Sequence, residues 1–145
     1  MKLVVDTNII IAALIRDSMT RWLLTHLQDE LMTIRFSKEE IEPYKPEILA
    51  KAKMKEAELD ALIESLFDRI VIIDDTIVKQ KMVAAGKIMD PIDPNDTPFI
   101  AAALATGADV WSDDAHFKRQ GTVRVWKTRE LVGRHRKLSD MADPD

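Results

Sequence analysis

Residues 2–15 read KLVVDTNIIIAALI. After Lys2, the run LVV is apolar and partly β-branched without polar alternation, which is typical of a strand buried on both faces. Asp6 ends this run, and Thr7 and Asn8 begin a helical stretch that polar residues close at Arg16. Because a buried strand followed directly by a helix is the first part of a βαβ unit, the stretch predicts a parallel sheet.

Further apolar runs alternate with helical patterns along the rest of the chain. We expect them to be strands at residues 31–36, 70–74, 108–112 and 122–126. Strands that alternate with helices predict an α/β fold with a parallel sheet covered on both faces. The chain length fits one domain, residues 1–138, and we expect the acidic segment 139–145 to be a disordered tail.

Local signals predict where several helices begin and end. Ser37 and Glu40 have the spacing of a capping box, which predicts a helix start at Ser37, and Pro43 favours a kink in that helix. Gly107 is expected to end the apolar helix that precedes it. A last short helix is expected at residues 128–132.

Composition excludes several kinds of site. The 145 residues contain no cysteine, which rules out disulfides, thiolate catalysis and cysteine-bound metals. His26, His116 and His135 form no HExxH or HxxxH pair, so a histidine-based metal site is not expected. The absence of GxGxxG and GxxxxGK[ST] motifs argues against a nucleotide cofactor.

Charge and hydropathy describe an ordinary globular chain. The formal net charge of −4 argues against a protein that coats nucleic acid, but a nuclease with acids gathered in a metal site remains compatible with it. No signal-peptide pattern is visible, and no apolar run approaches the roughly 20 residues of a membrane span. We therefore expect a cytoplasmic protein without a membrane segment.

Carboxylates follow the expected strands at their carboxyl ends. Asp6 comes directly after the first strand, and Asp113 and Asp114 come directly after the fourth. Glu40 lies shortly after the second strand, and Asp96 begins the helix that leads into the fourth. In open α/β sheets ligands bind outside the carboxyl ends of the strands, so these acids are expected at one edge of the sheet.

Clustered carboxylates indicate a particular chemistry. Close carboxylates repel one another unless a cation neutralises them, and Mg²⁺ or Mn²⁺ prefers such oxygen ligands. A bound metal of this kind lowers the pKa of its water and stabilises in-line phosphoryl displacement, which suits phosphodiester hydrolysis. Each acid taken alone could equally cap a helix. The convergence of four separate regions is what favours a metal site.

Four motifs, in this order, resemble those of the PIN-domain nucleases: VVDTNIIIAAL, FSKEEIEPYKPEI, DPNDTPFIAAALA and VWSDDAHF. The resemblance covers roughly residues 2–131. It implies a three-layer α/β/α sandwich with a five-stranded parallel sheet, a quartet of acids that holds Mg²⁺ or Mn²⁺, and cleavage of single-stranded RNA. Because many members are VapC-type toxins, it also implies a type II toxin–antitoxin pair with an antitoxin protein as partner, and we expect a homodimer.

The resemblance also implies roles for individual residues. It places the metal-binding catalytic acids on Asp6, Asp96 and Asp114. Glu40 would be the fourth catalytic acid, with Glu39 and Glu42 as alternatives in the same helix.

Other side chains would support these acids. Asn8 and Ser112 are expected to hydrogen-bond the ligands, and Asp93 is expected to be a helper or a structural acid. A set of cations could contact RNA phosphates, although a solvated surface explains them equally well: Lys118, Arg119, Arg134 and Arg136.

Two competing functions belong to other classes. The alternative is a catalytically silent RNA-binding or scaffold protein on the same fold, against which the acids at all four motif positions argue. A phosphatase of the haloacid-dehalogenase type would need D-x-D after the first strand, where this chain has Asn8 in place of the second acid.

Overall fold

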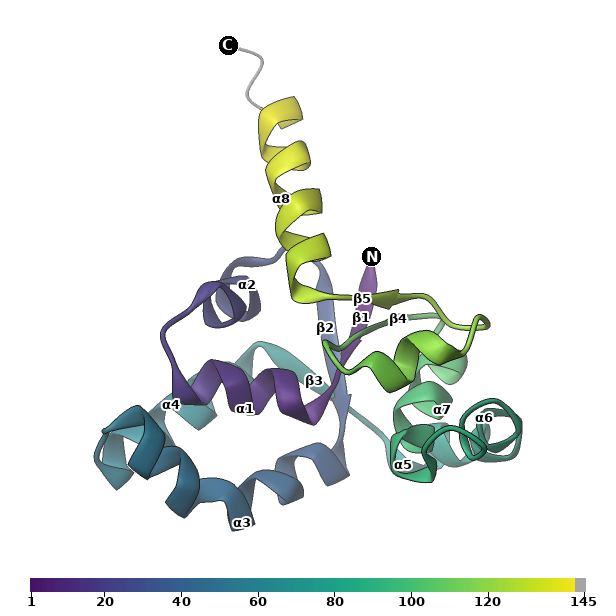
Figure 1. The fold of residues 1–145 in the computed structure, drawn as a ribbon, viewed down its shortest axis with the longest axis horizontal. Helices are drawn as coiled ribbons and strands as arrows, with labels where there is room; N and C mark the ends of the chain where they lie inside the picture. Colours follow the sequence, from purple (N-terminus) through teal and green to yellow (C-terminus); the bar gives the residue numbers. More distant parts are fainter. Residues whose placement is uncertain (143–145) are drawn as a thin grey trace.

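The computed structural model describes residues 1–142, and these contain a sheet of five parallel strands (Figure 1). The strands are β1 (Lys2–Val5), β2 (Glu30–Ile34), β3 (Ile70–Ile73), β4 (Asp109–Trp111) and β5 (Val125–Trp126). They lie in the order β3-β2-β1-β4-β5, and each neighbouring pair is parallel. The expected strands and the parallel sheet are therefore confirmed.

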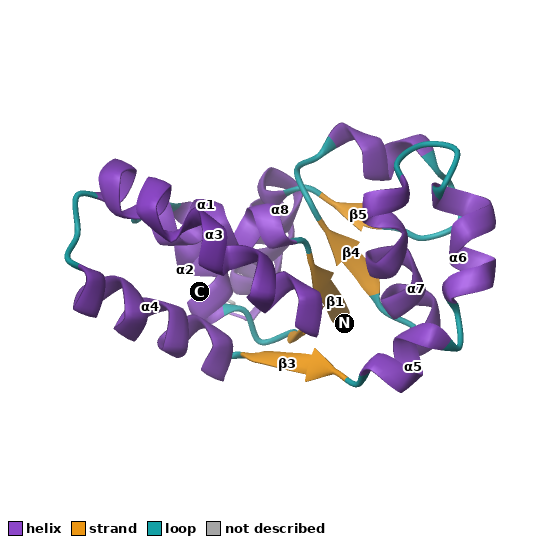
Figure 2. Ribbon diagram, turned by 90° about the horizontal axis from the view of Figure 1, so that it is seen from below, coloured by secondary structure: helices purple, strands orange, loops and turns teal. Residues whose placement is uncertain are grey.

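Helices cover both faces of this sheet, which makes the three layers of an α/β/α sandwich (Figures 1 and 2). One layer contains α1 (Thr7–Ile15), α2 (Met19–His26), α3 (Arg35–Ala52), α4 (Glu56–Asp68) and α8 (Thr128–Ala142). The other contains α5 (Asp75–Lys79), α6 (Met82–Met89) and α7 (Thr97–Thr106), with the 3-10 turns η1 (Pro94–Asp96) and η2 (Ala115–Arg119).

Strand β1 contributes to an apolar core on each side of the sheet. Leu3 and Val5 pack with residues of α1–α4 and α8, whereas Val4 packs with residues of α5–α7. All three side chains are fully buried. Burial on both faces explains why this segment lacks polar alternation.

The position of β1 also creates the crevice of the sheet. From β1 the chain adds β2 and β3 on one side and then β4 and β5 on the other. The carboxyl ends of β1 and β4 therefore flank the point where the strand order reverses, which is where open α/β sheets bind ligands.

The capping box predicted at Ser37 is wrong. Helix α3 begins at Arg35, directly after β2, and Ser37 lies inside it. The Ser37 hydroxyl does not cap its own helix because it shares a 2.5 Å hydrogen bond with the hydroxyl of Thr7. Helix α3 continues as a single helix as far as Ala52, and Pro43 lies inside it.

The C-terminal helix is longer than expected. Helix α8 continues from Thr128 to Ala142 instead of ending near residue 132, and its distal half extends away from the other layers (Figure 1). Residues 139–142, expected to begin a disordered tail, form its end, while residues 143–145 lie outside the described residues. The continuation was missed because the polar run GRHRK at residues 133–137 interrupts the apolar positions of this helix, which resume only at Leu138 and Met141.

The termination of α7 agrees with expectation. Gly107 adopts a left-handed conformation, with φ 70°, at the end of this helix. Within residues 1–142, no helix is both long enough and apolar enough to cross a membrane.

Candidate active site

Asp6 is held at the junction of β1 and β4. It occupies the N-cap position of α1 and is 4% exposed. The Ser112 hydroxyl donates a 2.8 Å hydrogen bond to Asp6 Oδ2 and accepts one of 3.0 Å from the backbone N–H of Asp114. The Asp6 N–H donates to the Trp111 carbonyl oxygen at 3.0 Å. These bonds fix the first and last of the predicted acids relative to each other.

A second set of hydrogen bonds positions Glu40. The Thr7–Ser37 bond holds the start of α3 against the start of α1, and Glu40 lies three residues further along the same face of α3. Thr7 Oγ1 also donates to Glu40 Oε1 at 3.4 Å. Glu39 and Glu42 are exposed, so the structure brings Glu40 to Asp6 and leaves the two alternatives outside.

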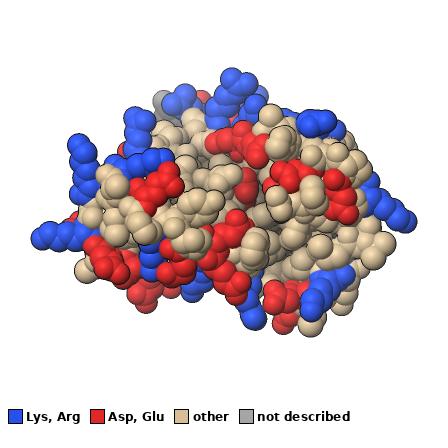
Figure 3. Space-filling model, turned by 60° about the horizontal axis from the view of Figure 1, so that its bottom comes forward, with Lys and Arg blue, Asp and Glu red and all other residues tan. Residues whose placement is uncertain are grey.

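Three of the four predicted acids, Asp6, Glu40 and Asp96, border a cleft of about 320 Å³, which we call the acidic cleft. It is lined by Asp6, Thr7, Asn8, Phe36, Glu40, Asn95, Asp96 and Phe99. Viewed towards the end of the molecule on which the strands open, acidic side chains gather across the centre, and most Lys and Arg side chains lie around the periphery (Figure 3). Asn8, expected to support the ligands, is exposed in this cleft.

Asp96 has an unusual environment for a carboxylate. It ends η1 at the N-terminus of α7, yet its side chain caps no helix. Its Oδ2 atom is buried and has no hydrogen-bond partner among the described residues. Burial, followed by the charges of Asp93, Asp6 and Asp114, raises the pKa of Asp96 to about 7. The site therefore disfavours the ionised carboxylate unless a cation is present.

The other cleft acids are shifted in the same direction. Burial raises the pKa of Asp6, opposed chiefly by the Ser112 hydrogen bond. Burial likewise raises the pKa of Glu40, opposed by the Thr7 hydrogen bond, and the charge of Asp6 adds to the rise. Several acids that each favour protonation in one cleft form a set that a divalent cation would stabilise.

A model of the PIN domain matches residues 4–135 of this sequence. The chain belongs to the PIN-domain family. This confirms the family expected from the motifs. Its fold also resembles a chain of the crystal structure of VapBC2 from Rickettsia felis bound to a DNA fragment from their promoter, with a TM-score of 0.63 and 17% identity over 88% of this chain and 98% of that chain. At this identity the likeness concerns the fold. No curated protein matches the sequence.

In this PIN domain, Asp113 and Asp114 do different things although they are adjacent. Asp113 points to α8, where it accepts hydrogen bonds from the backbone N–H and the hydroxyl of Thr128 at 2.8 and 2.7 Å. Asp114 is coupled to Ser112 and, by charge, to Asp6 and Asp96. The structure thus places Asp114, as expected, and not Asp113, with the other acids.

His116 is the side chain that the sequence reasoning missed. Its Nδ1 atom lies 3.3 Å from Asp93 Oδ2, 3.6 Å from Asp114 Oδ1 and 4.0 Å from Asp96 Oδ2. Asp93 Oδ1 meanwhile caps η1 by accepting the Asn95 N–H at 3.0 Å. His116 has no second histidine at metal-ligand spacing in the sequence. Its position two residues after Asp114, a predicted metal ligand, was the signal that could have identified it.

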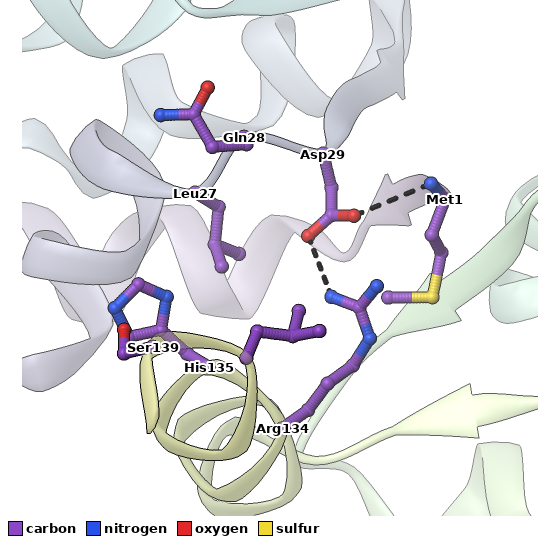
Figure 4. Close-up of a pocket in the computed structure, with 8 residues that line it drawn as sticks. Met1, Leu27, Gln28, Asp29, Arg134, His135 and Ser139 are labelled. Atoms are coloured by element: carbon purple, nitrogen blue, oxygen red, sulfur yellow. Dashed lines mark hydrogen bonds and ion pairs between the residues drawn. The ribbon is translucent and has the colours of Figure 1, made fainter. Parts of the chain in front are cut away.

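The cations predicted to contact RNA are dispersed over this PIN domain. Arg134 lies at the opposite end of β1 from Asp6, where its guanidinium donates a 3.1 Å hydrogen bond to the largely buried Asp29 beside a pocket of about 470 Å³ (Figure 4). Lys118 is paired with Glu130 at 2.6 Å. Arg119 and Arg136 are exposed. Arg119 lies on η2, which begins directly after Asp114, whereas Arg134 and Arg136 lie on α8.

Proposed function

We propose that this PIN domain is a metal-dependent endoribonuclease that hydrolyses phosphodiester bonds of single-stranded RNA. The observation that supports the proposal is the unpartnered, buried Oδ2 of Asp96 beside three further carboxylates. A buried acceptor without a donor costs free energy, and a cation bound at this atom would remove that cost.

The donor set fits a hard divalent cation. Asp6, Asp96 and Asp114 supply carboxylate oxygens from three separate elements, and Mg²⁺ and Mn²⁺ are bound by such oxygens. We assign metal binding to these three residues. When bound, the metal would supply a low-pKa water and offset the charge that develops on the phosphate.

The remaining residues of the site act on water and on one another. Glu40, whose pKa burial raises, is proposed to orient the attacking water and to accept its proton at Oε1 or Oε2. Ser112 keeps Asp6 in place through its hydrogen bond, and Thr7 does the same for Glu40. Asn8 offers an amide at the exposed side of the cleft to the phosphate or a ligating water.

Substrate and partner follow from the family resemblance. Exposed Arg119 and Arg136, together with Lys118, are proposed to attract RNA phosphates, and Arg134 is the weakest of the four because it is engaged by Asp29. The fold likeness to a chain of a VapBC2 assembly supports the toxin of a type II toxin–antitoxin pair, with an antitoxin partner.

A homodimer is also proposed. Exposed apolar side chains on the edge strand β3 and on α5, which follows it in the chain, are Val71, Ile72 and Ile77, with exposed fractions of 55%, 37% and 40%. Exposed apolar side chains at the edge of a sheet are commonly covered in an assembly.

The proposed activity can be tested with mixed single-stranded RNA oligonucleotides incubated in Mg²⁺, Mn²⁺ or EDTA. We expect cleavage by the native protein with metal, no cleavage in EDTA, and loss of cleavage in Asp6→Asn. Asp17→Asn serves as the matched control, because the Asp17 side chain is 89% exposed and lies beyond the C-terminal end of α1, whereas Asp6 caps its N-terminal end. Undiminished cleavage by Asp6→Asn would contradict the proposal. RNA binding without cleavage by the folded native protein would favour the silent RNA-binding alternative.

A further inference from the structure

His116 brings a nitrogen atom into the cluster of acids. Its Nδ1, one oxygen of Asp93 and one oxygen of Asp96 all lie within 4.8 Å of one another. These residues come from η1 and η2, which the chain separates by the whole of α7 and β4. The fold therefore assembles a group of possible metal ligands that differs from the four acids of the PIN motifs.

The ligand atoms are available for coordination. Asp93 uses Oδ1 to cap η1, so Oδ2 is the atom that faces His116. Asp96 Oδ2 is buried without a hydrogen-bond partner in the described part of the chain, and its 4.0 Å separation from His116 Nδ1 is too long for a hydrogen bond. An ion pair with His116 therefore leaves Asp96 Oδ2 unsatisfied.

The separations suit an ion held between these atoms. Metal–ligand distances of about 2.1 Å put adjacent octahedral ligands about 3.0 Å apart and opposite ligands about 4.2 Å apart. The distances from His116 Nδ1 to the Asp93, Asp114 and Asp96 oxygens, 3.3, 3.6 and 4.0 Å, fall between these limits.

The turn that carries His116 is well anchored. The His116 backbone N–H donates to Asp114 Oδ1 at 2.9 Å. The next residue, Phe117, is fully buried and packs edge-on against Phe99 at a centroid distance of 6.2 Å. These contacts fix the backbone on both sides of His116 and keep its imidazole beside η1.

We infer that Asp93, Asp96 and His116 form a mixed carboxylate–imidazole site for a divalent transition metal such as Mn²⁺, with His116 Nδ1 as a ligand. The inference rests on the proposed function, because it shares Asp96 with the proposed catalytic metal. Imidazole nitrogen suits transition metals, whereas Mg²⁺ strongly prefers oxygen. His116 thus makes the site selective for Mn²⁺ over Mg²⁺.

Electron spin-echo spectroscopy of bound Mn²⁺ tests this directly. The native protein should show modulation from a directly coordinated ¹⁴N, and His116→Gln should lose it. His135→Gln is the matched control, because His135 contacts the Trp22 ring and lines the pocket beside Asp29, away from the acids, and should leave the signal intact.

Calorimetric titrations provide the second readout. His116→Gln should weaken Mn²⁺ binding by at least about tenfold and leave Mg²⁺ binding within about twofold of the native value. Mn²⁺ that binds at the acids without ¹⁴N modulation would overturn the inference and leave the proposed nuclease function standing. Failure of the folded native protein to bind Mn²⁺ or Mg²⁺ at all would overturn both.

Discussion

Replacement of Asp96 by Asn should stabilise the metal-free protein while abolishing its activity. Burial and neighbouring acids raise the pKa of Asp96 from 3.8 to about 7. A carboxyl group with a raised pKa in the folded state carries no cost below pH 3.8, an increasing cost as the pH rises to about 7, and the full cost above it. Asn is neutral throughout this range, so the variant escapes the cost.

The size of the effect follows from the pKa difference. About three pH units at 1.36 kcal/mol each give an upper limit of about 4 kcal/mol at pH 8. Relaxation and water entry reduce this, so we expect a gain of roughly 2–4 kcal/mol, or a rise in Tm of roughly 6–12 °C for a domain of this size. At pH 5 about a third of the gain should remain.

Thermal unfolding in EDTA at pH 5 and pH 8 measures this gain. Mn²⁺ at a hundred times its Kd should stabilise the native protein by about 2.7 kcal/mol and the variant much less, so metal should largely cancel the difference at pH 8. The exposed Asp17→Asn variant should change the free energy of unfolding by less than about 0.5 kcal/mol. An Asp96→Asn variant that is less stable than the native protein in EDTA at pH 8 would refute the assigned environment of Asp96.

Further substitutions test the rest of the geometry. Glu40→Gln should reduce RNA cleavage by at least about 100-fold, whereas Glu42→Gln should change it less than about twofold. Equal losses of cleavage in the two variants would contradict the role proposed for Glu40. Ser112→Ala removes a 2.8 Å hydrogen bond to buried Asp6 and should cost about 2 kcal/mol in urea unfolding. Gly107→Ala, at φ 70° with open space for the added Cβ, should lower the free energy of unfolding by about 1 kcal/mol through backbone strain alone.

The sequence was most informative where one physical requirement governs a segment. The run LVV at residues 3–5 predicted β1 because strand residues buried on both faces of a sheet must be apolar. Gly107 predicted the end of α7 because few other residues adopt a left-handed conformation. Asp6, Asp96 and Asp114 were predicted to converge because parallel strands open on a common edge, and their charges are indeed coupled.

The sequence was least informative where a long-range contact outcompetes a local one. Ser37 has the spacing of a helix cap, but a partner 30 positions away, Thr7, takes its hydroxyl. His116 has no nearby histidine, so its contacts with Asp93 and Asp96 arise only when η1 and η2 are folded together. In α8 the polar run at residues 133–137 separates Leu138 and Met141 from the apolar residues of the first turn, which concealed the helical period in the sequence.

The chemistry of the cleavage products tests the central claim most directly. RNA would be cleaved with Mn²⁺ in ¹⁸O-labelled water, and the new termini would be analysed by mass spectrometry. Hydrolysis at the acidic cleft predicts one ¹⁸O atom in the terminal phosphate of each cut, no 2′,3′-cyclic phosphate, and continued cleavage when the 2′-hydroxyls are methylated. Cyclic-phosphate ends, formed equally well in EDTA and by Asp6→Asn, would show that the RNA's own 2′-hydroxyl attacks and would contradict the account.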